Sequence, residues 1–222
     1  MYLILFYTKV RKFENIKEAI LLISQAIVDK VEVFIQEHFK DEKTGHDWYH
    51  IERVYKMAME LQSIEGGNKG IIQLAALFHD FTDSKLKANP DEAELQMSDC
   101  LYQYGVIEED VKRIIDVIDC VSFSKGKKVP LNIEMQIVQD ADRLDAIGAI
   151  GIARCLTYGA AMQRPIYDPN HKEGTTIQHF HDKLLQIKDK IQTSTAKKIA
   201  IRRHKVLESY LKELENECNI QF

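Results

Sequence analysis

Apolar side chains recur every three or four residues along most of this chain, which is the spacing of one face of an α-helix. Between residues 16 and 39 they stand at Ile20, Ile23, Ile27, Val31, Phe34 and Ile35. The same spacing predicts further helices: from His46 or Asp47 to the break EGGNKG, over 71–78, from Pro90 to about Tyr104, from Glu108 to about Val121, over 133–158 as one helix or two, over 176–190, and over 194–217. The chain is therefore predicted to be all-α.

Several of the predicted helix ends carry residues that favour such ends. Asn68 suits an N-cap, Pro90 stands in a first turn with acidic residues behind it, and Gly105 is placed to end that helix. The chain shows no internal repeat, low-complexity tract or linker. We therefore predict one helical domain over residues 16–222.

Residues 1–15 are predicted to form a separate peripheral segment. Their apolar run has no basic stretch before it and no small-residue cleavage site after it. It is also far shorter than the ~20 residues that span a bilayer. We expect a peripheral strand or first turn, or a start codon assigned too early, and neither an export signal nor a membrane anchor.

The composition is that of an ordinary globular protein and narrows the range of partners. The 222 residues are 45% hydrophobic and 29% charged, with a net charge of −4. Such a chain offers no basic field for a nucleic-acid polymer, although a local basic pocket for a small phosphorylated molecule is allowed. The four cysteines have no C-x-x-C spacing, so we expect reduced thiols and a cytoplasmic location.

The stretch GHDWYH places two histidines, His46 and His50, four positions apart. On a helix they share a face, so they could bind one metal ion together, as in zinc proteases, or have different roles. The protease pattern H-E-x-x-H requires glutamate where this chain has Asp47.

Two further segments carry candidate chemistry. His79 and Asp80 are adjacent at the end of a strongly apolar helix, where a histidine is also an ordinary terminal residue. Asp140, Asp142 and Asp145 fall within a helix of small apolar residues. Buried carboxylates require a partner or a metal. The alternative is a surface-facing acidic turn paired with Arg143 and Arg154.

The order His, His-Asp, Asp along a helical chain resembles the HD-domain superfamily of metal-dependent phosphohydrolases. HIERV (50–54) resembles the family's first element and ADRL (141–144) its last. The resemblance extends over about 18–217, except for the amino-terminal ~15 residues, and is strongest to small single-domain bacterial members with nucleotide pyrophosphohydrolase-type activity. It implies a compact multi-helix bundle and a set of metal ligands: His50, His79, Asp80 and Asp142.

Two imidazoles and two carboxylates suit Mn²⁺ or Mg²⁺, with Fe²⁺, Co²⁺ and Ni²⁺ as alternatives. Such an ion polarises a phosphoryl oxygen and lowers the pKa of a water from near 16 towards ~7. In cyclic-nucleotide phosphodiesterases, which resemble HD domains, the first histidine of an HN..H pair is a general acid and the second binds metal. His46 matches the first position. The alternatives are that His46 caps its helix or contacts a phosphate.

Four other residues are candidates with open alternatives. Lys85 and Lys125 could contact phosphate groups or be surface lysines. Asp83 could accept a hydrogen bond from a metal-binding residue, act as a general acid/base or cap a turn. Arg53 could contact substrate or hold Asp142 or Asp145 in place. Of the remaining histidines, His179 is the best placed for a cleft.

The expected function is hydrolysis of a small phosphorylated substrate, first a nucleoside triphosphate to its monophosphate and pyrophosphate. Phosphomonoester hydrolysis comes second, and phosphodiester or alarmone hydrolysis third. A non-catalytic nucleotide-binding module and a helical interaction protein are the competing classes. Oligomeric state is open between monomer and homodimer.

Overall fold

Helix α4 (Lys69–Phe78) forms the centre of the fold, because every residue from Gly70 to Phe78 is buried. A helix that is apolar on all sides needs neighbours on all sides. Its neighbours are α2 (Gln25–His38), α3 (Trp48–Glu65), α6 (Glu108–Val121) and α7 (Ile133–Asp145). Helix α5 (Pro90–Gln103) packs on α6 at the edge of this group.

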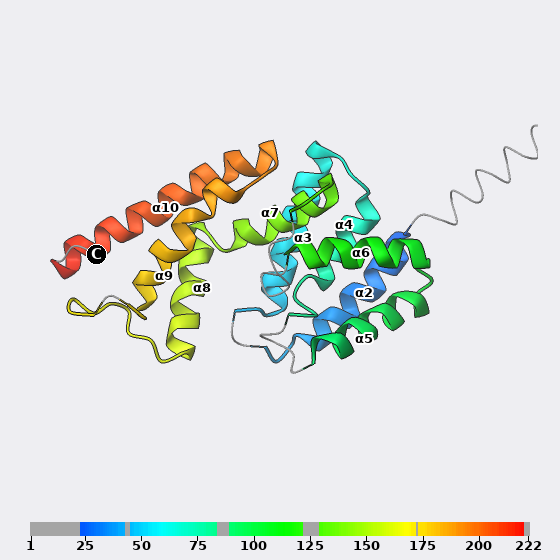
Figure 1. The fold of residues 1–222 in the computed structure, drawn as a ribbon, viewed down its shortest axis with the longest axis horizontal. Helices are drawn as coiled ribbons and strands as arrows, with labels where there is room; N and C mark the ends of the chain where they lie inside the picture. Colours follow the sequence, from blue (N-terminus) through cyan, green and yellow to red (C-terminus); the bar gives the residue numbers. More distant parts are fainter. Residues whose placement is uncertain (1–22, 43–44, 84–88, 122–128, 172, 220–222) are drawn as a thin grey trace, which may run out of the picture.

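The remaining helices form a second group, made of α8 (Gly148–Ala161), α9 (Thr176–Asp182) and α10 (Ser194–Cys218). Helix α7 runs between the two groups (Figure 1), and it contacts α3, α4 and α6 on one side and α8 and α10 on the other. The structure is a computed structural model that describes residues 23–42, 45–83, 89–121, 129–171 and 173–219. Within these ranges it contains helices and no strand, which confirms the all-α prediction.

The predicted helix ends are confirmed where short-range signals marked them. The Asn68 side chain accepts a hydrogen bond from the Ile71 amide at the start of α4. Pro90 is the first residue of α5, and Gly105, with φ of 88°, follows the C-cap Tyr104. Of the predicted helix over 16–39, the structure shows Gln25–His38; the peripheral segment over 1–15 lies outside the described residues.

The segment 133–158 folds as two helices, one of the two predicted outcomes. The break falls at Gly148, the first residue of α8, where φ is 78°. A side chain at Gly148 would also place its Cβ 3.0 Å from Cγ of Arg203. Glycine therefore allows both the turn and the close approach of α10.

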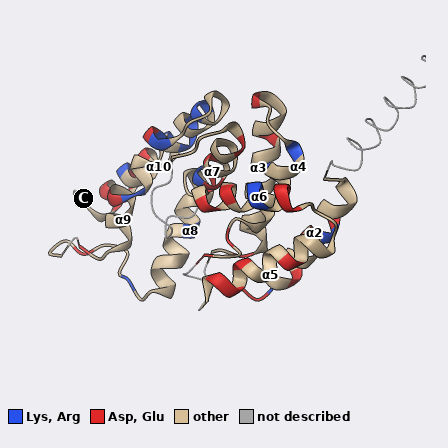
Figure 2. Ribbon diagram, turned by 45° about the vertical axis from the view of Figure 1, so that its right-hand side comes forward, with Lys and Arg blue, Asp and Glu red and all other residues tan. Residues whose placement is uncertain are grey.

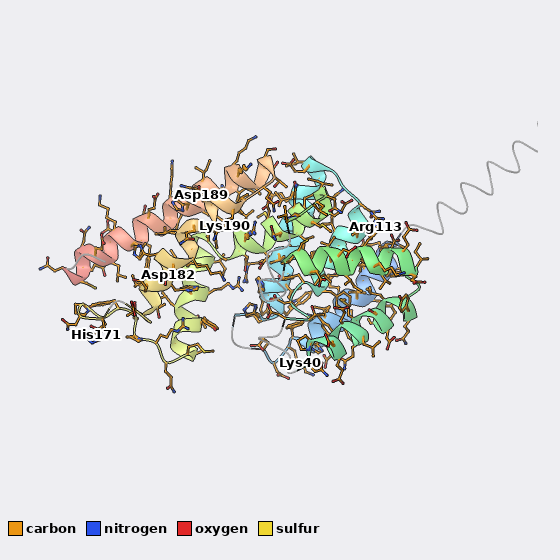
Figure 3. All side chains as sticks on the ribbon, in the orientation of Figure 1. Lys40, Arg113, His171, Asp182, Asp189 and Lys190 are labelled. Atoms are coloured by element: carbon orange, nitrogen blue, oxygen red, sulfur yellow. The ribbon has the colours of Figure 1, made fainter. Side chains whose placement is uncertain are left out.

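The prediction of a continuous helix over 176–190 is wrong. Helix α9 ends at Asp182, and two 3₁₀ turns follow, η1 (Leu184–Gln186) and η2 (Lys188–Lys190). Asp182 is the last residue of α9, and Asp189 and Lys190, which are labelled in Figure 3, belong to η2, which contacts α10. Apolar residues three or four apart suggested a helix, but tighter i→i+3 turns bury the same side chains at this turn in the chain.

The C-terminus of α8 gives a stability prediction. Gln163 has a positive φ of 54°, a conformation that costs a non-glycine residue about 1 kcal/mol. Gln163→Gly should therefore raise the free energy of unfolding by up to about 1 kcal/mol, measured by urea denaturation. Gln178→Gly, inside α9, is the matched control and should destabilise the protein; a loss of stability at both positions would contradict the interpretation.

Among the described helices, none is both long enough and apolar enough to cross a membrane.

Candidate metal centre

Three helix ends meet at one place in the structure and bring the predicted ligands together. His50 lies in the first turn of α3, where its amide donates to the N-cap Asp47. His79 and Asp80 directly follow α4, and Asp142 lies in the last turn of α7. Because α3, α4 and α7 pack on one another, residues from three distant parts of the sequence converge.

The distances between the four predicted ligands suit a single ion. Nε2 of His50 and Nε2 of His79 are 3.1 Å apart. Oδ2 of Asp80 lies 3.2 Å from the first nitrogen and 3.5 Å from the second, and Oδ1 of Asp142 lies 3.6 and 3.9 Å from them. Atoms bound ~2.1 Å from one ion lie about 3.0–3.4 Å from their neighbours.

The hydrogen bonds on the far side of each ring fix both tautomers. Nδ1 of His79 donates to the Ala76 carbonyl at 2.8 Å, and Nδ1 of His50 donates to the Asp145 carboxylate at 2.7 Å. In the neutral rings, both Nε2 atoms therefore present lone pairs to each other, which is unfavourable unless a metal ion or a proton lies between them. Together with two carboxylates, this donor set fits a divalent ion.

Asp145 connects the His50 ring to two arginines. Its oxygens accept from Arg53 Nε at 2.8 Å and Nη2 at 3.1 Å, and from Arg154 Nη1 at 2.9 Å. Burial acts to raise the pKa of Asp145, but His50 and Arg53 outweigh it and hold that pKa well below its usual range. Asp145 thus stays ionised and orients the ring of a ligand.

The alternative of a surface-facing acidic turn is wrong, because Asp140 and Asp145 are buried. Arg154 is indeed the partner of Asp145, as that alternative proposed. Asp140 instead accepts from the amides of Gln192 and Thr193 and so joins α7 to the start of α10. Its burial follows from paired hydrogen bonds rather than from a metal.

His46 lies beside the centre, next to Asp80. Its Nδ1 is 2.7 Å from Oδ2 of Asp80, its ring centroid is 5.6 Å from that of His50, and its side chain is 25% exposed. The helix cap is Asp47, so the alternative that His46 caps α3 is wrong. His46, His50 and Asp80 also form a second group able to hold an ion, which keeps the shared-ligand alternative open.

Arg154 holds the segment before α3 in place. Its Nε donates to the Gly45 carbonyl at 3.0 Å while its Nη1 binds Asp145. One guanidinium from α8 therefore binds both Gly45, the residue before His46, and Asp145, the carboxylate that accepts from His50. The hydrogen bond between Arg154 and Gly45 joins residues more than a hundred positions apart. No short motif in the sequence indicates it.

A cavity of about 300 Å³ opens next to the centre, which is the size range of small-ligand pockets. His46, His79, Asp80, Asp83 and Asp142 line one end. Arg53 does not line it and instead contacts Asp145, as one of its predicted alternatives stated. Lys85 and Lys125 lie outside the described residues.

The protonation of His50 gives a pH prediction for the metal-free protein. Burial acts to lower its pKa, but hydrogen bonds to Asp145 and Asp80 outweigh this and raise the pKa to about 9. Stabilisation by the protonated ring is thus complete below its ordinary pKa of ~6.5 and is lost as the pH rises through 9, in total about 3 kcal/mol. Urea denaturation with chelator at pH 6, 7.5 and 9 should show this loss. His50→Gln should not show it, and identical pH profiles would contradict the assignment.

Comparisons with known proteins identify the family of this chain. The HD domain family matches residues 47–147. The uncharacterized protein YpgQ of Bacillus subtilis (strain 168) is 39% identical over 195 residues, which cover 85% of this chain and 92% of YpgQ.

Three crystal structures are similar over nearly their whole length. The Lin1889 protein from Listeria innocua has a TM-score of 0.76 at 43% identity, over 89% of this chain and 98% of that one. An HD-superfamily hydrolase from Bacillus thuringiensis has a TM-score of 0.74 at 40% identity, over 89% and 99%. Bacillus subtilis YpgQ in complex with ADP has a TM-score of 0.74 at 34% identity, over 86% and 97%. The resemblance found in the sequence is thereby confirmed, and the chain belongs to the HD-domain superfamily.

Proposed function

We propose that this protein is a divalent-metal-dependent phosphohydrolase that acts on a small nucleotide, first a nucleoside triphosphate cleaved to the monophosphate and pyrophosphate. The observation that carries the proposal is the pair of facing Nε2 atoms of His50 and His79, flanked by the carboxylates of Asp80 and Asp142, at one end of a cavity. The crystal structure of YpgQ with ADP supports a nucleotide as the ligand.

His50, His79, Asp80 and Asp142 would hold the ion. When bound, a divalent ion supplies Lewis-acid chemistry, since it polarises a phosphoryl oxygen and makes a water more acidic. The remaining task of the protein is to orient the substrate and to move protons. Asp145 contributes by fixing the His50 ring, and Ala76 does the same for His79 through its carbonyl.

His46 is proposed as the general acid. Hydrolysis adds water across a P–O bond, so that the water oxygen joins phosphorus and the leaving oxygen needs a proton. With Nδ1 of His46 directed at Asp80, Nε2 is the ring nitrogen left for the leaving oxygen. Asp83 lines the same end of the cavity and is proposed to accept a proton from the water.

The proposed phosphate contacts of Lys85 and Lys125 remain predictions. Arg53 is proposed as a positioning residue rather than a substrate contact, because both of its described hydrogen bonds go to Asp145.

The test is a panel of nucleotides and phosphoesters assayed with Mn²⁺, Mg²⁺, Co²⁺ and Ni²⁺, with the products separated by chromatography. We expect monophosphate and pyrophosphate from nucleoside triphosphates, and no turnover by Asp142→Ala or in the presence of a chelator. Full activity of Asp142→Ala would refute the proposal, as would the absence of turnover with every substrate and ion.

A further inference from the structure

The cavity has a second, cationic wall, formed by lining residues outside the metal centre. It is made of Tyr158 on α8, Arg164 just after α8, His179 on α9 and Lys183 just after α9. These four residues belong to the second helix group, whereas the proposed metal ligands lie in α3 and α7 or directly after α4. The acidic and cationic walls therefore come from different parts of the chain and meet only across the cavity.

The two permanent cations of this wall, Arg164 and Lys183, line the same cavity as the Cys155 thiol. Burial raises the pKa of Cys155 to about 11, and the charges of Arg164 and Lys183 both act on that thiol in the opposite direction. Cys155 itself lines the cavity. The wall thus concentrates positive charge in a partly enclosed space, where an anion is bound more strongly than on an open surface.

The backbone around Arg164 is held by paired hydrogen bonds. The Arg164 amide donates to the Gly159 carbonyl at 2.9 Å and the Gln163 amide to Ala160 at 3.0 Å, a Schellman arrangement that ends α8. The guanidinium lies over the Tyr158 ring, 5.8 Å from its centroid.

The start of α9 is fixed to the same segment. The Thr176 amide donates to Pro165 at 2.9 Å and the Ile177 amide to Ile166 at 3.0 Å. Helices α8 and α9 also approach so closely that a Cβ at Gly159 would lie 2.2 Å from Oγ1 of Thr176. The elements that carry Arg164 and Lys183 are therefore preorganised relative to each other, which reduces the cost of ordering them around a ligand.

We propose that Arg164 and Lys183, with His179 beside them, form an anion subsite for the phosphate groups that are not attacked. This inference rests on the proposed function and specifies its substrate class: a compound with two or more linked phosphates, one at the metal centre and another at the cationic wall. An arginine offers paired donors to phosphate oxygens and a lysine a compact charge. A simple phosphomonoester leaves this wall without a ligand.

Binding is tested by titration calorimetry with inorganic tripolyphosphate on chelator-treated protein. Arg164→Gln combined with Lys183→Gln should weaken binding about 10- to 100-fold. The control Lys212→Gln removes one of the charges of α10, whose basic residues are visible in Figure 2, and should bind like wild type. Absence of binding by wild type, or equal binding by the double variant, would overturn the inference.

Turnover then separates this inference from the proposed function. The double variant should lose kcat/KM for nucleoside triphosphates by a similar factor and keep its activity on p-nitrophenyl phosphate. Equal losses of activity on both substrates would contradict the subsite. The subsite would also be contradicted if the double variant bound nucleosides more weakly than wild type but bound tripolyphosphate equally well. Absence of any hydrolysis by wild type would reject the proposed function, while the calorimetry still decides whether the subsite exists.

Discussion

Replacing His50 with alanine should abolish both divalent-ion binding and hydrolysis, whereas replacing His46 should leave the ion bound and remove most of the hydrolysis. The two residues are four positions apart, but their surroundings differ. His50 is fully buried, and its Nε2 lies 3.1 Å from the nitrogen of His79. His46 is partly exposed, and its ring is hydrogen-bonded to Asp80.

The expected magnitudes follow from these positions. Loss of a ligand removes the site, so Mn²⁺ binding by His50→Ala should fall below detection in titration calorimetry. Loss of a general acid typically costs about 10²–10⁴ in rate, so His46→Ala should retain Mn²⁺ affinity within a few-fold and lose kcat by that factor. The exposed loop residue His171 offers a control, because His171→Ala should change neither quantity.

The outcome that contradicts this division is equal loss of Mn²⁺ binding in both variants. Such a result would assign His46 to the ion, in the group that it forms with His50 and Asp80.

Asp145→Ala is expected to have the largest effect on stability among substitutions of residues that do not bind the metal. Its carboxylate is the common acceptor for His50, Arg53 and Arg154, and all three lose a partner at once. Removing one partner of a buried ion pair costs about 3–5 kcal/mol. The Arg53 side chain is 34% exposed and that of Arg154 is 18% exposed, so water compensates in part and we expect the lower end, about 3 kcal/mol.

The same substitution should weaken metal binding about 10- to 100-fold, because the His50 ring loses the hydrogen bond that orients it. Stability should be measured by urea denaturation with chelator, so that the loss of metal does not contribute. Asp189→Ala removes an exposed carboxylate on η2 and serves as the control. A stability loss below about 1 kcal/mol, the value of an exposed ion pair, would contradict the role of Asp145.

Sequence patterns predicted those parts of the fold that depend on near neighbours. Asn68 and Pro90 mark helix starts because their effects act within three residues. The helix over 176–190 was mispredicted because apolar spacing alone does not distinguish one α-helix from α9 followed by two 3₁₀ turns. The conformation of Lys183, with φ of −133° and ψ of −58°, is set by packing rather than by a local signal.

In the candidate site, too, short motifs could be recognised in the sequence, whereas contacts between distant residues could not. The proposed metal ligands could be named from the sequence because they stand in short motifs, HIERV and ADRL among them. The contact between His50 and Asp145 joins positions 95 apart, and that between Arg154 and Gly45 joins positions 109 apart. Arg164 carries no motif, and the packing of α8 against α9 brings it and Lys183 to one cavity.

The most direct test of the metal centre is the anomalous diffraction of crystals soaked in Mn²⁺. We expect one strong peak in contact with Nε2 of His50, Nε2 of His79 and the carboxylates of Asp80 and Asp142. A strong peak elsewhere in the molecule with none at these four residues would contradict it.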